Sequence, residues 1–403
     1  MTPPRSPDGV QRNPGQAVTD SPPFPECPPL PDSAGAPSGL RESAASIGVA
    51  LVGYGYAGRT FHAPLIRSTP GVELGVVVTS RPANVRADIP ACRSVADVRE
   101  ILQDPAIELV VIATPNATHA PLAELALRAG KHVVVDKPLT LSLADARRLA
   151  ALAAEHGRLL SVFQNRRWDG DFLALQAVIA EGGVGTVTHL ESRFDRFRPE
   201  VRERWREGAA GGGIWFDLGP HLVDQALVLF GLPERVGGAM ARRRPGAEAD
   251  DWCQVQLDYG HLQVTLSASM LVGGGIPRFA VHGRGGSWVS HGLDVQEDQL
   301  RAGMRPGAEG WGRDLRPALR YRDGATEECP IPAGDYPRYY HAVGHAIRGR
   351  GPNPVAPAEA VATMAVLETA VESARARRIL PLPLSEAERG AFDAARPPRL
   401  PAA

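Results

Sequence analysis

The sequence predicts an α/β protein of two domains, the first with a parallel, doubly wound sheet and the second with an open, mostly antiparallel sheet. Three observations predict this fold class. Short apolar runs alternate with helical stretches up to about residue 165. A glycine motif follows the first run directly, and strand-like segments dominate the part of the chain that comes next.

The composition is that of a soluble protein acting on small molecules. The 403 residues are 43% hydrophobic and 22% charged, with a formal net charge of -1. This near-neutral charge gives no excess of basic residues to bind nucleic acid or an anionic membrane surface, so neither is a predicted partner. No apolar run is long enough to span a membrane, and the N-terminus lacks the apolar core of a secretory signal. We therefore expect a cytoplasmic protein.

Changes in composition divide the chain into four parts. Residues 1–45 are rich in Pro, Ser and Gly without apolar periodicity, and we expect a disordered tail there. A cofactor domain is predicted over 46–165, a substrate and oligomerisation domain over 166–380, and a C-terminal tail over 381–403.

Within the first domain, five apolar runs have the length of strands: 49–52, 74–78, 109–113, 133–135 and 159–163. Helical stretches lie between them. One of these opens at Ser142 and closes at Gly157, and another closes at Gly130. This alternation predicts βαβ units.

The second domain begins with a predicted helix over 171–180 and continues as a strand-rich region with a hairpin at Tyr259 and Gly260. Two late helices, over 336–348 and 357–377, are expected to return to the first domain or to close the cleft. An exposed sheet favours a homo-oligomer, either a dimer or a tetramer.

The motif GYGYAG at residues 53–58 matches the G-x-G-x-x-G pattern of a dinucleotide-binding Rossmann domain, because it follows a strand and opens a helix. The first glycine allows a tight turn, the second lets the pyrophosphate approach the backbone, and the third lets helix and strand pack closely. A glycine turn without a ligand is the alternative. The predicted cofactor contacts in this loop are Gly53, Tyr54, Gly55, Tyr56, Ala57 and Gly58.

The second apolar run ends in Thr79, Ser80 and Arg81, without the acid that holds the ribose hydroxyls in an NAD site. Hydroxyls and a guanidinium suit a 2′-phosphate, which a carboxylate repels. NADP is therefore the predicted cofactor, with NAD as the second choice. A solvated Arg81 without any ligand is the alternative.

Two further strands end in polar loops that should face the nicotinamide, because ligands bind beyond the carboxyl ends of the strands in an open α/β sheet. The run VVVDKPL places Asp136 and Lys137 at one end. The predicted contacts in the other loop, ATPNATH, are Thr114, Pro115, Asn116 and His119. Helix capping by Asn116 or Thr118 is the alternative there.

The segment GGGIWFDLGPHLVDQ places Asp217 and His221 four residues apart, on one face of a predicted helix. Three interpretations are open for the two residues: a pair of metal ligands, a catalytic pair, or an ordinary pair on a helix surface. A catalytic zinc usually has three protein ligands, and no C-x-x-C spacing or histidine cluster is present, so no metal is predicted. Oxidation of a secondary alcohol needs a base and a donor to the developing alkoxide. The predicted catalytic residues are therefore Lys137, Asp217 and His221.

The segment QNRRWD offers Arg166 and Trp168 as neighbours of the substrate, with packing or capping as the alternative. The arginines over 193–206 alternate with acids, which is typical of a solvated, ion-paired surface. Within them, Arg196 and Arg198 are further candidates for the active site.

Six motifs occur in one order: GYGYAGRTFHAPL, ATPNATH, AGKHVVVDKPLT, SVFQNRRWDGDF, FDRFRPEVRERWRE and GGGIWFDLGPHLVDQ. On these motifs the chain, from about residue 47 to 380, resembles the Gfo/Idh/MocA oxidoreductases, and most of all their NADP-dependent scyllo-inositol dehydrogenases. The resemblance implies a Rossmann domain joined to an α/β domain whose open sheet often forms the oligomer interface.

The family's Glu-Lys-Pro motif falls on Asp136, Lys137 and Pro138, and its Asp-x-x-x-His motif falls on Asp217 and His221. The resemblance implies that the lysine and the histidine assist proton transfer and that Asp217 helps to hold a polyol. Asp136 departs from the usual glutamate, which bears on the nicotinamide contacts.

The predicted function is reversible hydride transfer between NADP and a secondary hydroxyl of a cyclic polyol or sugar. A catalytically silent, NAD(P)-binding regulator on the same fold is the alternative.

Overall fold

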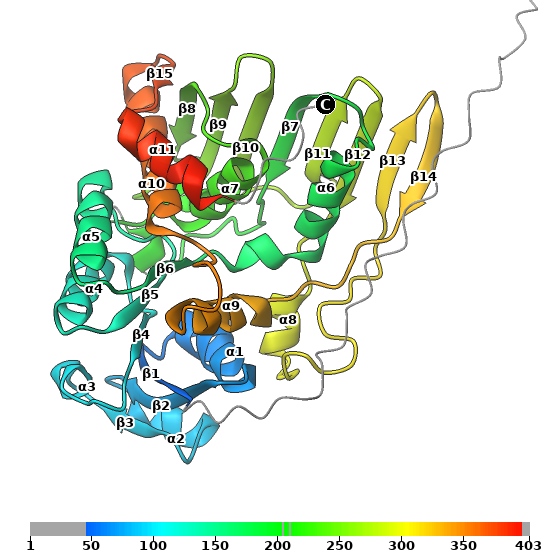
Figure 1. Cartoon of the computed structure of the whole chain (residues 1–403). Helices are drawn as coiled ribbons and strands as arrows, with labels where there is room; N and C mark the ends of the chain where they lie inside the picture. The colour runs from blue at the N-terminus through cyan, green and yellow to red at the C-terminus, as the bar shows by residue number, and fades with distance from the viewer. Residues whose placement is uncertain (1–45, 204, 209–210, 397–403) are drawn as a thin grey trace, which may run out of the picture. The chain divides into compact units, whose positions relative to one another are not determined.

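The computed structural model describes residues 46–203, 205–208 and 211–396. Within them two sheets form, and the predicted fold class is confirmed (Figure 1). The predicted disordered tail, 1–45, lies outside the described residues, as does the C-terminal end of the chain, 397–403. No helix in the described ranges has the length and apolarity to cross a membrane.

The first sheet has six parallel strands in the order β3-β2-β1-β4-β5-β6. They are β1 (Ile47–Val52), β2 (Val72–Val78), β3 (Arg93–Val95), β4 (Leu109–Ile112), β5 (His132–Asp136) and β6 (Leu160–Phe163). Every side chain of β4 and β6 is buried, as expected for strands covered on both faces. The strand order reverses between β1 and β4, and the carboxyl ends of strands at such a point frame a ligand crevice.

The helical segments of this part are η1 (Gly58–His62), α1 (Ala63–Ser68), α2 (Pro82–Asp88), α3 (Arg99–Leu102), η2 (Asn116–Thr118), α4 (His119–Arg128), α5 (Leu143–Glu155) and η3 (Asn165–Trp168). The expected helix signals are present. The Ser142 hydroxyl caps α5 by accepting from the backbone N–H of Asp145. Gly130 and Gly157 have positive φ of 73° and 59° just past α4 and α5, where left-handed backbone favours glycine.

The second sheet has nine strands in the order β14-β13-β12-β11-β7-β10-β9-β8-β15. They are β7 (Val187–Arg193), β8 (Arg235–Ala241), β9 (Trp252–Asp258), β10 (Gln263–Ser269), β11 (Pro277–Gly283), β12 (Gly286–His291), β13 (Ala318–Arg322), β14 (Ala325–Cys329) and β15 (Leu380–Pro381). All neighbours are antiparallel except β7 and β10. The predicted hairpin at Tyr259 and Gly260 joins β9 to β10. Burial alternates along β9, because only one face of the sheet is covered.

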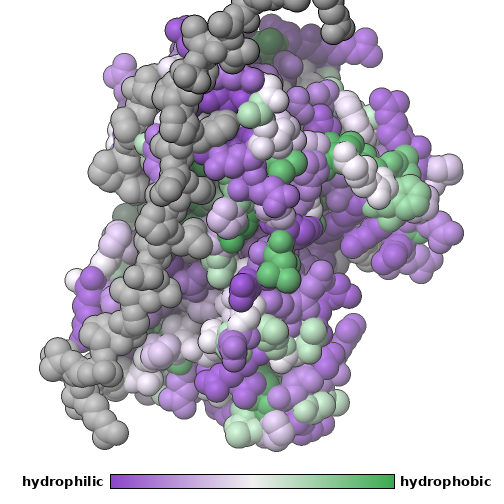
Figure 2. All heavy atoms as spheres, turned by 90° about the vertical axis from the view of Figure 1, so that its right-hand side faces the viewer, coloured by the Kyte–Doolittle hydropathy of each residue, from purple (hydrophilic) through white to green (hydrophobic). Residues whose placement is uncertain are grey.

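The helical segments of this part are α6 (Gly170–Ala180), η4 (Trp205–Glu207), α7 (Ile214–Phe230), α8 (Gln296–Arg301), α9 (Pro337–Ile347), α10 (Pro357–Ala376) and α11 (Glu386–Ala395). Helix α7 packs on β9 and β10, and α10 packs on β8 (Figure 1). The two late helices contact elements of the first part, α9 lying against α1 and α10 against α5. On the face shown in Figure 2, hydrophilic side chains predominate and hydrophobic ones form small separate groups.

One expectation for the end of the chain differs from the structure. Residues 381–403 were expected as a tail, but they contain α11. A capping box between Ser385 and Glu388 stabilises its first turn, and Phe392 is buried against the core while α11 packs on α10. The apolar contact and the cap together order this segment.

Candidate active site

The glycine loop between β1 and η1 has the geometry of a phosphate cradle. Gly53 has a φ of 99°, which disfavours any other residue, and a Cβ there would press on the carbonyl of Ala113. A Cβ on Gly58 would collide with the carbonyl of Gly53. At Gly55, by contrast, no described atom would lie within 4 Å of a Cβ. The open space at Gly55 is where a pyrophosphate approaches the backbone in this kind of loop, so these residues fit a dinucleotide.

A cavity beside this loop carries a positive lining. The lining includes Tyr54, Gly55, Tyr56 and four arginines: Arg59, Arg67, Arg81 and Arg301. Asp88 neutralises Arg59, because its carboxylate accepts from Arg59 Nε at 2.5 Å and Nη2 at 2.8 Å. Arg67 and Arg81 make no ion pair within the described part of the chain.

Arg81 is one of the residues that line this cavity. Its backbone N–H donates to Thr79 Oγ1 at 3.0 Å, and the guanidinium is exposed. Ser80 is exposed as well, and Ala57 is half-buried in the turn that enters η1. An exposed guanidinium in the lining of the cavity suits a phosphate oxygen.

The loop after β4 is held by hydrogen bonds within the loop and to neighbouring loops. His119 is buried, and its ring nitrogens face two carbonyl oxygens, that of Pro138 at 2.8 Å from Nδ1 and that of Thr114 at 2.9 Å from Nε2. Its ring therefore has no free nitrogen for a cofactor and instead ties the loop after β4 to the loop after β5. Asn116 Nδ2 donates to the carbonyl of Gly211 at 3.2 Å. Neither Asn116 nor Thr118 caps a helix with its side chain, and Pro115 leads into η2.

Lys137 follows β5 directly and reaches α7. Its Nζ donates to the backbone carbonyl of Asp217 at 2.5 Å and to Asp217 Oδ1 at 3.2 Å. The carboxylate of Asp136 contacts the backbone of the next residue, where its Oδ1 accepts from the N–H of Lys137 at 2.9 Å. The ammonium group of Lys137 is thus fixed in the crevice by a residue of the second part.

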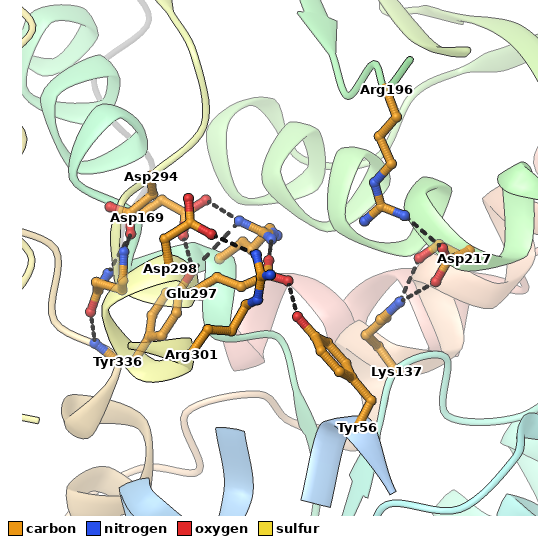
Figure 3. Close-up of polar contacts among 12 residues, drawn as sticks. Tyr56, Lys137, Asp169, Arg196, Asp217, Asp294, Glu297, Asp298, Arg301 and Tyr336 are labelled. Atoms are coloured by element: carbon orange, nitrogen blue, oxygen red, sulfur yellow. Dashed lines mark hydrogen bonds and ion pairs between the residues drawn. The ribbon is translucent and has the colours of Figure 1, made fainter. Parts of the chain in front are cut away.

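Asp217 lies in the first turn of α7 and is surrounded by cations. Arg196 Nη1 lies 3.3 Å from its Oδ2, and Arg206 Nε lies 3.4 Å from its Oδ1. Figure 3 shows Arg196 and Lys137 pointing toward Asp217 from opposite sides. Burial opposes ionisation of this carboxyl, but the three positive charges outweigh it and hold the pKa of Asp217 well below its usual range. Asp217 is therefore a carboxylate at neutral pH.

His221 lies one turn further along α7, and its ring packs parallel to that of Phe194 with centroids 6.3 Å apart. Its Nδ1 is buried and has no hydrogen-bond partner among the described residues. Burial, together with the charges of Lys137 and nearby arginines, lowers the pKa of His221 well below the usual value for histidine. The imidazole is neutral at pH 7 and able to accept a proton.

Lys137, Asp217 and His221 line a single cavity of about 490 Å³, which also borders Tyr56 of the glycine loop. The structure thus brings the three predicted catalytic residues together at the carboxyl end of the first sheet. No group of three or more His, Cys, Asp or Glu able to hold a metal occurs in residues 46–203, 205–208 and 211–396.

The two predicted substrate neighbours differ in position. Arg166 lines the cavity, although it is buried and its Nη2 donates to Glu297 Oε2 at 2.9 Å. Trp168 packs edge-on against Tyr339, with centroids 5.8 Å apart, and is not one of the described residues lining the cavity. For Trp168 the packing alternative therefore describes the structure.

The sequence did not indicate several of the residues that line the cavity. Arg206 was part of a segment interpreted as a solvated surface, and Glu297 and Arg301 lie on the short helix α8. Tyr56 Oη donates to Glu297 Oε1 at 2.7 Å, so the glycine loop is joined to α8 across the cleft (Figure 3). No sequence signal marks these contacts, which connect residues up to 241 positions apart. Arg196 and Arg198, the open candidates, both line the cavity.

A parallel sheet of this order, a glycine cradle at its crevice and a second α/β part completing a polar cavity define a two-domain oxidoreductase that binds a dinucleotide. Residues 47–164 match the family model described as the oxidoreductase family, NAD-binding Rossmann fold, and residues 176–384 match that of the C-terminal alpha/beta domain. The chain belongs to the Gfo/Idh/MocA family of oxidoreductases.

Several relatives are similar along most of their length. An uncharacterized oxidoreductase of Escherichia coli, YdgJ, is 49% identical over 340 residues, which cover 83% of this chain and 98% of that one. The NADP(+)-dependent scyllo-inositol 2-dehydrogenase IolW of Bacillus subtilis is 38% identical over 350 residues, covering 85% and 98%. A crystal structure of an oxidoreductase from Klebsiella pneumoniae is 52% identical, with a TM-score of 0.83 and coverage of 87% and 99%.

Proposed function

We propose that this oxidoreductase transfers a hydride between NADP and a secondary hydroxyl of a cyclic polyol or sugar. The observation that carries the proposal is the cavity that Lys137, Asp217 and His221 line beside the glycine loop. It offers a neutral imidazole and a fixed ammonium group together, which are the base and the donor that an alcohol oxidation needs. The relative named for scyllo-inositol supports the substrate class.

Each of the three side chains has a distinct role. His221 takes the proton from the hydroxyl that is oxidised. Lys137 donates to the same oxygen as negative charge develops on it. Asp217 positions Lys137 through its carbonyl and carboxylate and keeps a lone pair for a neighbouring hydroxyl. The reverse reduction of a ketone uses the same groups in the opposite order.

The cofactor supplies the hydride acceptor when it is bound. We favour NADP because Arg81 follows β2 where an NAD site carries an acid, and because the Bacillus subtilis relative is named for NADP(+). The exposed guanidinium of Arg81 is suited to a 2′-phosphate.

The test is a spectrophotometric assay of the purified chain with NADP+ or NAD+ and a panel of inositols and pyranoses. We expect reduction of NADP+ in preference to NAD+. Replacing the proton acceptor or the donor, by His221→Asn or Lys137→Met, should lower kcat by about 10² to 10⁴-fold. The exposed His261→Asn is the matched control and should leave kcat unchanged. Unaltered turnover in the first two variants, or no turnover of any compound in the panel, would refute the proposal.

A further inference from the structure

The cavity holds more positive charge than a neutral polyol requires. Seven of its lining side chains are cationic and three are acidic, and two of the cations, Arg166 and Arg301, also pair with acids outside the lining. Lys137, Arg196 and Arg206 all share one carboxylate, that of Asp217, although their side chains are only 13%, 22% and 27% exposed. Uncompensated charge is costly where water is partly excluded, and a bound anion offsets that cost.

The cofactor does not account for this excess. Arg301 lines the nucleotide cavity as well as the catalytic one and pairs with Asp298 at 3.0 Å, so it does not contribute to the excess in the catalytic cavity. The arginines Arg196, Arg202 and Arg206 line the catalytic cavity and do not line the nucleotide cavity. They belong to the segment between β7 and α7, which approaches Asp217 from the side opposite to Lys137 (Figure 3 shows Arg196).

Of these three arginines, Arg202 is the best candidate to bind an anion. It lines the cavity, is exposed, and its guanidinium makes no hydrogen bond or ion pair within the described ranges. An arginine fork matches a carboxylate or phosphate by two parallel hydrogen bonds. Arg196 and Arg206 already form ion pairs with Asp217 and supply charge at the same place.

We propose that the substrate is an anionic sugar or cyclic polyol, bearing a carboxylate or a phosphate that Arg202 binds with the support of Arg196 and Arg206. This inference rests on the proposed function, because it names the substrate class of the same site.

The proposed anion also has a consequence for the base. Burial and then the charges of Lys137, Arg166, Arg278 and Arg196 depress the pKa of His221. An anion bound among these cations offsets part of their effect and raises the proton affinity of the imidazole. The charged group of the substrate thereby makes His221 a stronger base for its own oxidation.

The experiment compares neutral sugars with their charged counterparts on the intact chain with NADP+. The neutral compounds are D-glucose, D-galactose and myo-inositol. The carboxylate arm is D-glucuronate and D-galacturonate, and the phosphate arm is D-glucose 6-phosphate and an inositol monophosphate, so the two arms distinguish the anions. We expect kcat/KM for an anionic compound to exceed that of its neutral parent at least tenfold. Its KM should rise with ionic strength, while that of the parent should not.

Variants then assign the effect to Arg202. In Arg202→Gln the ratio of kcat/KM for the anion to kcat/KM for its neutral parent should fall about tenfold, since one charge-assisted pair is lost. Arg202→Lys should recover part of the loss, because it keeps the charge without the fork. Arg375→Gln, on the exposed side of α10, is the control and should change neither value.

Calorimetry of the NADPH-loaded protein separates this inference from the proposed function. If no sugar is oxidised but D-glucuronate or D-glucose 6-phosphate binds and Arg202→Gln weakens the binding, the proposed function fails and the anion site stands. If neutral compounds are oxidised as well as their anionic counterparts, and calorimetry shows no preference for the anions, the inference is overturned while the proposed function survives.

Discussion

The charge state of His221 follows from its neighbours more than from its own chemistry. An exposed imidazole titrates near pH 6.5, in the middle of the working range. Here burial and the surrounding cations favour the neutral ring, so that the deprotonated form persists to lower pH. Lys137 and Arg196 both contribute to this effect, and Asp217 lies between them as a permanent carboxylate. The site thus keeps its base available at the expense of base strength.

This state predicts the pH dependence of the reaction. In the proposed mechanism, oxidation of the alcohol requires deprotonated His221, so a lowered pKa of His221 moves the acid limb of kcat/KM to lower pH. We expect no inflection near pH 6.5 when kcat/KM of the free enzyme is measured from about pH 5 to pH 9. Arg196→Gln removes one cation and should shift the limb upward. An acid limb centred at or above pH 6.5 in the wild-type enzyme would contradict the assignment.

At the scale of single elements, the glycine loop separates a folding requirement from a binding requirement. Gly58 packs so closely on the backbone of Gly53 that no side chain fits. Gly55, by contrast, has open space where a Cβ would stand and an ordinary backbone conformation. The constraint on Gly55 therefore comes from the ligand, and the constraint on Gly58 comes from the fold.

Alanine substitutions distinguish these two requirements. Gly55→Ala should leave the free energy of unfolding nearly unchanged and raise the Kd for NADPH about tenfold or more, because the methyl group occupies the place of the pyrophosphate. Gly58→Ala should lower the stability of the apo protein by about 1–3 kcal/mol. Gly390 lies within α11, and a Cβ there would have no close neighbours. Gly390→Ala should therefore lower neither the stability of the protein nor its affinity for NADPH. Equal Kd values for wild type and Gly55→Ala would disprove the cradle.

The elements predictable from the sequence are those with a repeated local signal. The buried parallel strands have continuous apolar runs, and α4 and α5 end at glycines in left-handed backbone. The short strand β3, the helix α8 and the edge strand β14 have no such signal, because few of their side chains are buried. Helix α11 is different, since its capping box from Ser385 to Glu388 is visible in the sequence as S-x-x-E.

At the scale of the whole described chain, one buried guanidinium joins its two parts. Arg167, just after β6, pairs with Asp224 of α7 at 2.7 Å and with Glu359 of α10 at 2.9 Å. Its Nη1 also donates to the carbonyl of Pro354 at 2.9 Å. Removing one partner of such a buried group leaves the remaining charges uncompensated.

We expect Arg167→Met to lower the free energy of unfolding by about 3–5 kcal/mol, because two buried carboxylates lose their counter-ion. Arg348 provides a matched control. Its ion pair with Glu108 is partly exposed, with side chains 29% and 36% accessible, so Arg348→Met should cost less than about 1 kcal/mol. Urea denaturation measures both. Similar losses in the two variants would show that Arg167 does not hold the parts together.

Only part of the candidate site was predictable from the sequence. Lys137, Asp217 and His221 stand out because strand ends and helical spacing are properties of local sequence. Arg206 and Glu297 enter the cavity through long-range packing, which no local pattern encodes. His119 and Trp168 have the residue types of a binding site, yet hydrogen bonds and an aromatic contact occupy them in the structure.

The hydrogen bond from Tyr56 to Glu297 couples the nucleotide site to the substrate cavity, so neither can be redesigned independently of the other. Tyr56 belongs to the loop that determines nucleotide affinity, and Glu297 holds Arg166 in the wall of the substrate cavity. A redesign that switches nucleotide preference by rebuilding the glycine loop is therefore expected to disturb the wall of the substrate cavity as well. Because such coupling is reciprocal, evolution of a new substrate specificity in this scaffold would be accompanied by a change in nucleotide affinity.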